Sequence, residues 1–358
     1  MRDERVSTTA EGPLRERSRR EGPRIYLFDN LKAILMTLVV FGHMIELVWG
    51  DMHGNSFTWV LYIFIYLFHM PLFVFCSGYL AKYRPGKTLA GMVYPYLVFQ
   101  LAYLSFERAF MGSRAPIQLV TPYWIMWYLS SLIIWVSMLP MIEVVAKGKK
   151  GAILASGLAL AIGLLSGFDA SIGLNFNIGR TLYFLPFFVA GVAVKRAVKM
   201  ETLLGFGANR YVKYGLLALS AATGVLVALF FQGINIHSIN GHLAYSPRYT
   251  FLHRVLFYLL GIIVCLFLIA ATPRKKTFYS YIGQRTIQVF LPHAFVVRLL
   301  SKSGVFAAPM NEYVRLLAFA GVSVVVVCVF SSKAMGMLLA PLLAWPFRPF
   351  RLRPFAKG

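Results

Sequence analysis

Two ionisable residues share one face of an otherwise apolar stretch near the start of the chain. Lys32 and His43 lie 11 residues apart within residues 24–49, which read RIYLFDNLKAILMTLVVFGHMIELVW. In a helix this spacing is about three turns, so both side chains face the same side, roughly 16 Å apart along the axis. Ionisable side chains at membrane depth cost several kcal/mol and usually serve a function. This pair is therefore the first candidate for chemistry.

His43 is the strongest candidate for catalysis. An imidazole titrates near neutral pH and can act as a general base, a nucleophile or a metal ligand. Glu46, three residues further along, lies on the same helical face and could orient the ring. The alternative is a histidine at a helix end that hydrogen-bonds a carbonyl or lipid headgroups. The charged neighbours on the same helix favour the catalytic interpretation.

The cations near the other end of this helix have two interpretations each. Lys32 can pair with Asp29 or extend to the membrane surface, or it can meet an anionic group that enters from the cytoplasm. Lys82, Arg84 and Lys87 follow the second apolar stretch. Such a cluster suits phosphate or pyrophosphate binding, but a basic loop also anchors the cytoplasmic end of a helix.

Further polar residues occur inside or at the edges of apolar stretches. His69 precedes Met70 and Pro71, where a proline kinks a helix and frees carbonyl groups; a buried, hydrogen-bonded histidine is the alternative. Arg254 is expected about a turn inside a span, where it needs a carboxylate, carbonyls or a substrate anion. The remaining candidates for substrate binding are Arg180, Trp127 and His293. The alternative is that they mark the boundaries of spans or belong to the aromatic belt at the membrane surface.

The composition indicates a membrane protein that crosses the bilayer many times. The 358 residues are 58% hydrophobic with a mean hydropathy of +0.67, and only 14% are charged. The net charge of +23 lies in short clusters between apolar runs, so membrane topology explains it better than nucleic-acid binding. Three cysteines fall inside apolar runs without metal-ligand spacing, and we expect no metal site; they are Cys76, Cys265 and Cys328.

A window of about 20 residues predicts an all-α protein with about ten spans. The basic residues gather in alternate loops, so the positive-inside rule predicts that both termini are cytoplasmic. We expect a disordered basic tail at 1–24, an integral membrane domain at 25–332, and an interfacial helix with a basic tail at 333–358. The predicted spans are 25–49, 57–81, 88–110, 121–146, 151–168, 180–198, 211–232, 249–272, 282–301 and 314–332.

The sequence resembles the acyltransferase 3 family of integral membrane acyltransferases, and within it the branch named for fucose 4-O-acetylase. The resemblance rests on YLFDNLKAILMTLVVFGHMIE and FIYLFHMPLFVFCSGYLAK, with weaker support from PYWIMWYLSSLIIW, RTLYFLPFFVAGVAVKR and YIGQRTIQVFLPHAFV. It implies a roughly ten-span helical fold in the plasma membrane. It also implies transfer of an acyl group, usually acetyl, from cytoplasmic acetyl-CoA to a hydroxyl of a carbohydrate or lipid-linked glycan.

The family's signatures appear here with substitutions that keep the charge. Its arginine, ten residues before a histidine, is Lys32 before His43, and its Arg-x-x-Arg is Arg84-Pro85-Gly86-Lys87. The lysine loses the bidentate recognition that a guanidinium offers. The resemblance implies that acetyl-CoA, as a co-substrate rather than a bound cofactor, places its phosphates near these three cations.

The same resemblance implies the roles of the remaining candidates. His43, supported by Glu46, would deprotonate the acceptor hydroxyl or carry the acyl group, and His69 would assist. The expected partners are the lipid bilayer, acyl-CoA and a carbohydrate or glycolipid acceptor. A transporter or flippase for a glycolipid or polysaccharide is the alternative function, and a non-catalytic membrane scaffold is a third. The expected substrate-binding residues are Arg180, Arg254, Trp127 and His293.

Overall fold

The computed structural model describes residues 24–51, 56–113, 118–172 and 177–343, which form helices and no β-strand. Nine helical stretches in these residues are long and apolar enough to cross a membrane, so the predicted all-α membrane fold is confirmed. The long helices are α2 (Tyr26–Ile45), α3 (Phe57–Leu80), α5 (Tyr94–Met111), α6 (Trp127–Val145), α7 (Gly148–Leu165), α8 (Ile178–Ala197), α10 (Arg210–Phe230), α12 (Phe251–Ala271) and α16 (Glu312–Ser331).

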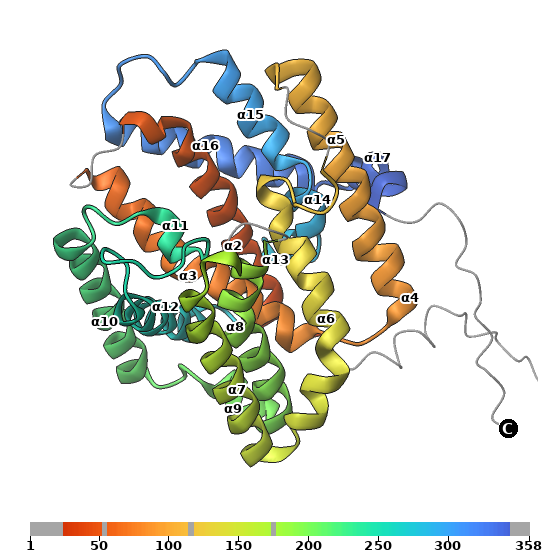
Figure 1. The fold of residues 1–358 in the computed structure, drawn as a ribbon, viewed down its shortest axis with the longest axis vertical. Coiled ribbons are helices and arrows are strands. Elements are labelled where there is room, and N and C mark those ends of the chain that lie inside the picture. The colour runs from red at the N-terminus through yellow and green to blue at the C-terminus, as the bar shows by residue number, and fades with distance from the viewer. Residues whose placement is uncertain (1–23, 52–55, 114–117, 173–176, 344–358) are drawn as a thin grey trace, which may run out of the picture.

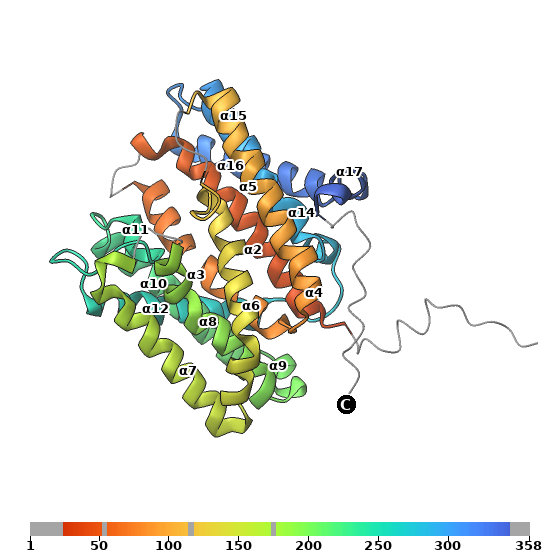
Figure 2. The same cartoon turned by 45° about the vertical axis from the view of Figure 1, so that its right-hand side comes forward.

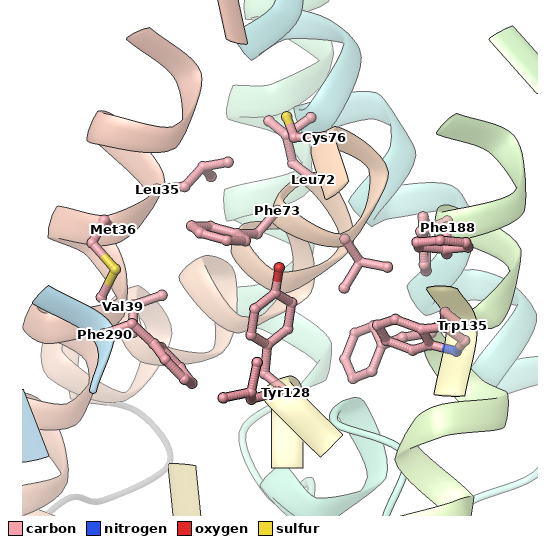
Figure 3. Close-up of a cluster of buried hydrophobic side chains, with 14 of the residues drawn as sticks. Leu35, Met36, Val39, Leu72, Phe73, Cys76, Tyr128, Trp135, Phe188 and Phe290 are labelled. Atoms are coloured by element: carbon pink, nitrogen blue, oxygen red, sulfur yellow. The ribbon is translucent and has the colours of Figure 1, made fainter. Parts of the chain in front are cut away.

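Helix α2 occupies the interior of the bundle, with α3 and α16 packed against it (Figures 1 and 2). Most of its residues are buried. A large apolar core surrounds its middle (Figure 3). The side chains of this core come from α2, α3, α6, α8 and α14 (Thr286–Phe290) and include Leu35, Met36, Val39, Leu72, Phe73, Cys76, Tyr128, Trp135, Phe188 and Phe290.

The predicted span at 282–301 is not a continuous helix. It consists of three short helices, α13 (Ser280–Gly283), α14 (Thr286–Phe290) and α15 (His293–Ser303). Pro292, which has no backbone N–H, lies at the second break. The Tyr103 hydroxyl donates to the Leu291 carbonyl there. Non-helical backbone at membrane depth is tolerated only where the protein satisfies it, and this contact meets that condition.

The three short helices run alongside α2 from one of its ends to the other. Asn30 in the first turns of α2 accepts a hydrogen bond from Ser280 at 2.6 Å, and His293 stacks on His43 near the last turn of α2. This discontinuous segment, residues 280–303, is therefore a candidate for the tenth crossing, which stays a prediction. Arg24, just before the first membrane helix in the sequence, and Lys333, just after the last, line one cavity. Which face of the membrane that cavity is on stays a prediction.

The remaining chain connects and flanks the bundle. Residues 1–23 of the tail predicted at 1–24, and residues 344–358 of the segment predicted at 333–358, lie outside the described residues. The predicted interfacial helix corresponds to α17, where the Tyr94 hydroxyl donates to the Pro341 carbonyl at 3.0 Å. Its position at the membrane surface stays a prediction. The short helices are α4 (Pro85–Thr88), α9 (Met200–Gly205), α11 (Ile236–Ile239) and α17 (Lys333–Leu343), with the turns η1 (Glu46–Asp51), η2 (Leu89–Val93), η3 (Trp124–Met126), η4 (Ser166–Phe168) and η5 (Ala170–Ile172).

Two glycines allow α3 and α8 to touch through their backbones. A Cβ atom at Gly78 would overlap the Phe188 carbonyl, and one at Gly191 would overlap the Phe75 carbonyl and the Tyr79 amide. Small residues at such a crossing let membrane helices approach closely, where packing replaces the hydrophobic effect as the driving force. The crossing fixes α8, and with it Arg180 in its first turn, relative to α3.

We predict that Gly78→Ala lowers the stability of the folded protein by about 1–3 kcal/mol, because the added methyl group must push the two backbones apart. The matched control is Gly157→Ala on α7, where a Cβ meets no atom within 4 Å and helix propensity favours alanine by about 1 kcal/mol. The measurement is the Tm of the purified protein in detergent. Equal Tm values for the two variants would contradict the packing argument.

Candidate active site

His43 and Glu46 form a hydrogen-bonded pair where α2 ends. The helix stops at Ile45, and Glu46 begins the short turn η1. The Nδ1 atom of His43 lies 3.2 Å from Oε2 of Glu46. Because an ionised carboxylate can only accept hydrogen bonds, Nδ1 carries the proton and Nε2 keeps its lone pair. The basic nitrogen of the pair is therefore Nε2, on the side of the ring away from the carboxylate.

The second carboxylate oxygen of Glu46 is held by two tyrosines of α3. The hydroxyl of Tyr62 donates to Oε1 at 2.8 Å, and that of Tyr66 donates to the same atom at 2.5 Å. Both tyrosines lie on one face of α3 because they are four residues apart. They fix the carboxylate so that its other oxygen faces His43. In nucleophilic and general-base sites, a further group commonly orients the base. Here Glu46 orients His43, and the two tyrosines orient Glu46.

Two further rings confine His43. The edge of Trp124 in η3 meets it with ring centroids 4.7 Å apart, and His293 stacks on it at 5.5 Å. His293 is fully buried, and its Nδ1 donates to the Phe290 carbonyl at 2.6 Å. Its Nε2 has no hydrogen-bond partner among the described residues. His293 thus lies beside His43 but lines neither of the cavities described below, and substrate binding by His293 stays a prediction.

Two cavities adjoin the His43–Glu46 pair, and Glu46 and Trp124 line both of them. The Arg298 cavity, of about 370 Å³, is lined by His43, Glu46, Leu47, Glu107, Tyr123, Trp124, Val297, Arg298 and Ser301. The Arg180 cavity, of about 460 Å³, is lined by Glu46, Trp49, Tyr62, Thr121, Pro122, Trp124, Asn177, Arg180, Ile236, His237, Asn240 and His242. Their volumes are typical of small-molecule sites.

Arg180 is a buried cation at the wall of its cavity. Its Nη2 lies 3.2 Å from Nδ1 of His242, and its guanidinium lies 5.0 Å from the centre of the Trp127 ring. Its Nε has no hydrogen-bond partner among the described residues. Trp127 is only 8% exposed and stacks on Phe184, so it supports Arg180 and lines neither cavity. The aromatic side chain that does line both is Trp124.

Arg254 lies in a closed cage instead of a cavity. Its guanidinium donates to the Tyr249 hydroxyl and the Gly163 carbonyl at 2.9 Å each, and to the Leu243 carbonyl at 3.0 Å. The ring of Tyr245 lies 4.8 Å away. The protein itself thus provides the carbonyls that a membrane arginine needs. Substrate binding by Arg254 stays a prediction that this geometry does not favour.

Two further predicted residues, His69 and Lys32, have their contacts within their own helices or with a neighbouring side chain. His69 is buried, and its Nδ1 donates to the Ile65 carbonyl of its own helix at 2.8 Å. Its ring meets the edge of Tyr66 at 4.7 Å, which connects it to Glu46 through one side chain. The amine of Lys32 lies 3.5 Å from the Asp29 carboxylate.

The predicted donor-binding cations after α3 are exposed. Arg84 and Lys87 lie around the first turn of α4, and neither lines the two cavities. The cavities at His43 also exclude Lys32, so no continuous opening joins it to His43 through them. Donor binding by these three cations stays a prediction.

Several residues of the site were not predicted. Tyr62 and Tyr66 hold Glu46, and Arg298 forms a bidentate ion pair with Glu107 at 2.7 and 2.9 Å in the second cavity. Trp124 belongs to the aromatic run TPYWIMWYL, which was interpreted mainly as a belt at the membrane surface. The four-residue spacing of the tyrosines was a usable signal for a polar face on α3.

A histidine cluster accompanies Arg180. His242 accepts from Arg180 at Nδ1, and its Nε2 lies 3.4 Å from Oδ1 of Asn177. Burial and the nearby Arg180 charge lower the pKa of His242 to about 3. The same two causes lower the pKa of His237. Both rings are therefore neutral at physiological pH and act as hydrogen-bonding groups.

Together these features define a class: a multi-pass membrane protein with a carboxylate-supported histidine between two cavities at one end of its bundle. The chain belongs to the acyltransferase domain family, whose sequence profile matches residues 25–333. This confirms the family predicted from the sequence, whereas the fucose 4-O-acetylase-like branch stays a prediction.

Two characterised sequences are similar to parts of the chain. Nodulation protein NolL of Sinorhizobium fredii is 33% identical over 118 residues, which are 28% of this chain and 32% of that protein. Nodulation protein NolL of Mesorhizobium japonicum is 44% identical over 57 residues, 15% of each chain. The chain thus matches about a third or less of the length of these relatives. No solved structure is significantly similar to it.

We predict that the protein loses stability as the pH falls below the pKa of an unfolded histidine, about 6.5. A folded-state pKa near 3 for His242 means that the unfolded state binds the extra proton first, which costs up to about 2 kcal/mol at pH 5. His242→Gln should flatten the decline of Tm between pH 7 and pH 5. An unchanged decline in this variant would show that His242 does not stay neutral in the fold.

Proposed function

We propose that this protein is a membrane O-acyltransferase that moves an acyl group, of acetyl size, from acyl-CoA to a hydroxyl of a carbohydrate or lipid-linked glycan. The observation that carries the proposal is the His43–Glu46 pair, in which a fixed carboxylate holds one nitrogen of a histidine that lines a cavity. Membership of the acyltransferase domain family supports the reaction class.

The reaction needs one proton transfer in each direction. His43 takes the hydroxyl proton at Nε2 as the acceptor oxygen attacks the thioester carbonyl. The resulting imidazolium is stabilised by Glu46, as an oriented carboxylate stabilises the histidine of a hydrolase triad. The intermediate then collapses, the C–S bond breaks, and the proton passes from His43 to the thiolate. The products are an ester and a free thiol.

The two cavities suit the acceptor. The Arg298 cavity, which His43 lines, would hold the reacting hydroxyl. The Arg180 cavity offers what a neighbouring sugar needs: flat aromatic surfaces at Trp49 and Trp124, and amides at Asn177 and Asn240. The side-chain oxygen of Asn240 is buried without a hydrogen-bond partner among the described residues. A sugar hydroxyl would supply that partner and remove the cost of the unpaired acceptor.

The sidedness of the proposed reaction follows from the charge of the loops. The positive-inside rule puts the start of α2 in the cytoplasm and the His43 end of the bundle at the outer face of the plasma membrane. An acyl-CoA donor would then enter at the basic end, and the acceptor at the end that holds the two cavities. Because the acceptor attacks the thioester at His43, the pantetheine arm of the donor would carry the acyl group through the interior of the bundle.

We predict that His43→Ala lowers the rate of acyl transfer by about 10²–10⁴-fold, the usual contribution of a general base. The matched control is His253→Ala, which removes a histidine that caps α12 through Thr250 and lines neither cavity. The measurement is the acetyl content of surface glycans, by mass spectrometry, in cells that produce each variant at equal levels. Normal acetylation with His43→Ala would overturn the assignment.

We predict that Glu46→Gln lowers the rate on the order of 10–100-fold, because the amide orients the ring but cannot stabilise its charged form. Tyr66→Phe should have a smaller effect, about two- to fivefold, since Tyr62 still holds the carboxylate. Both rates are measured with radiolabelled acetyl-CoA in membrane vesicles. An effect of Tyr66→Phe equal to that of Glu46→Gln would mean that Tyr66 takes part in the reaction directly.

A further inference from the structure

A cavity of about 490 Å³ lies at the end of the bundle opposite His43. We call it the basic cavity. Four cations line it, and its lining contains no carboxylate. They come from four separate parts of the chain: the start of α2, the loop before α13, the α13–α14 break and the start of α17. Its lining consists of Arg24, Tyr26, Lys276, Tyr281, Gln284, Arg285, Ser331, Ser332 and Lys333.

Most of this positive charge is not neutralised by the protein. Arg24 donates to the Asp29 carboxylate at 2.6 Å, and the amine of Lys32 lies 3.5 Å from the same group. For Lys276, Arg285 and Lys333, the described residues place no carboxylate within ion-pair distance. Like charges around one cavity repel each other, so an anion bound between them removes that cost.

The loop that carries Lys276 is fixed before any ligand binds. Asn30, fully buried in α2, donates from Nδ2 to the carbonyls of Pro273 and Lys275, both at 2.9 Å. Its Oδ1 accepts from the hydroxyl of Thr277 at 2.8 Å. Lys276 thus sits between two residues anchored to one side chain. A backbone held in this way reduces the entropy lost on binding.

Aromatic and amide groups adjoin the cations. The Arg285 guanidinium lies 5.9 Å from the centre of the Tyr281 ring, and the ring itself is 37% exposed. One turn beyond Arg285, the side-chain oxygen of Gln288 is buried without a hydrogen-bond partner among the described residues. The cavity therefore combines charge for phosphates with a flat ring for a base, while Gln288 lies outside its lining.

We propose that the basic cavity binds the coenzyme A part of the thioester donor. The phosphates would bind Lys276, Arg285 and Lys333, and the adenine would stack on Tyr281. The inference rests on the proposed function, and it moves donor recognition away from Arg84 and Lys87. A lipid headgroup shares the phosphate chemistry, but it has neither an aromatic base nor a pantetheine arm.

The test measures ligand binding without catalysis. The full-length protein in nanodiscs of zwitterionic lipid is titrated calorimetrically with coenzyme A and with adenosine 3′,5′-bisphosphate. Lys276→Gln combined with Arg285→Gln should weaken both affinities at least tenfold. The matched control, Lys147→Gln with Lys149→Gln, removes two charges at the start of α7 and should leave both affinities unchanged.

A rival variant decides between the two basic clusters. If Arg84→Gln with Lys87→Gln weakens coenzyme A binding at least tenfold and the cavity variant does not, the inference is overturned. Tm values without ligand show whether each variant is folded. If the cavity variant unfolds, two other variants replace it. Lys276→Arg with Arg285→Lys keeps both charges. Tyr281→Ala removes only the ring and should still weaken adenosine 3′,5′-bisphosphate binding severalfold. An unchanged affinity with Tyr281→Ala would then count against the site.

Anionic lipid and acyl transfer provide the remaining distinctions. If the cavity variant binds coenzyme A normally but loses a Tm increase caused by phosphatidylglycerol in the nanodisc, the cavity is a headgroup site and the inference fails. If the wild type binds coenzyme A in the cavity but transfers no acetyl group, the proposed function fails while the site stands. Normal transfer together with unchanged coenzyme A affinity in the cavity variant overturns the site alone.

Discussion

The candidate site depends on one carboxylate. Glu46 joins the last turn of α2 to α3 through Tyr62 and Tyr66, and its remaining oxygen holds His43. Glu46 is partly buried, with its side chain 23% exposed, and hydrogen-bond donors offset the cost of removing a carboxylate from water. Here the donors come from two helices, so the ring can keep its orientation only while α2 and α3 stay in register. The backbone contact of α3 with α8 at Gly78 fixes Arg180 relative to the same pair.

Residue spacing predicted what is local to one helix, and it could not predict what lies between helices. The His43–Glu46 pair was visible because residues three apart share a helical face. Trp124 was not, since its approach to His43 depends on how two helices cross. The break at Pro292 was hidden for a similar reason. An apolar run of membrane length predicts a continuous helix, while the contact that satisfies the broken backbone comes from Tyr103, far away in the sequence.

Two arginines at membrane depth show why residue type alone does not define a role. Both Arg180 and Arg254 were expected to bind substrate, with a span boundary as the alternative for Arg180. In the fold, carbonyls and tyrosines bond the guanidinium of Arg254 on all sides, which makes it part of the scaffold. Arg180 has a neutral histidine and an indole as neighbours and borders a cavity. The difference lies in the number of satisfied donors, which only the tertiary structure reveals.

The discontinuous segment has a consequence for how this architecture can vary. In one continuous helix, each residue is rotated by a fixed 100° from the next, so a shift at Arg285 would turn His293 as well. The breaks before Thr286 and His293 remove that constraint. Substitutions, insertions or deletions at one end of the segment can therefore be absorbed before they reach the other. Along this segment, a change at one end of the bundle need not shift the side chains at the other. Natural selection can therefore alter the residues around one cavity without altering those at the opposite end.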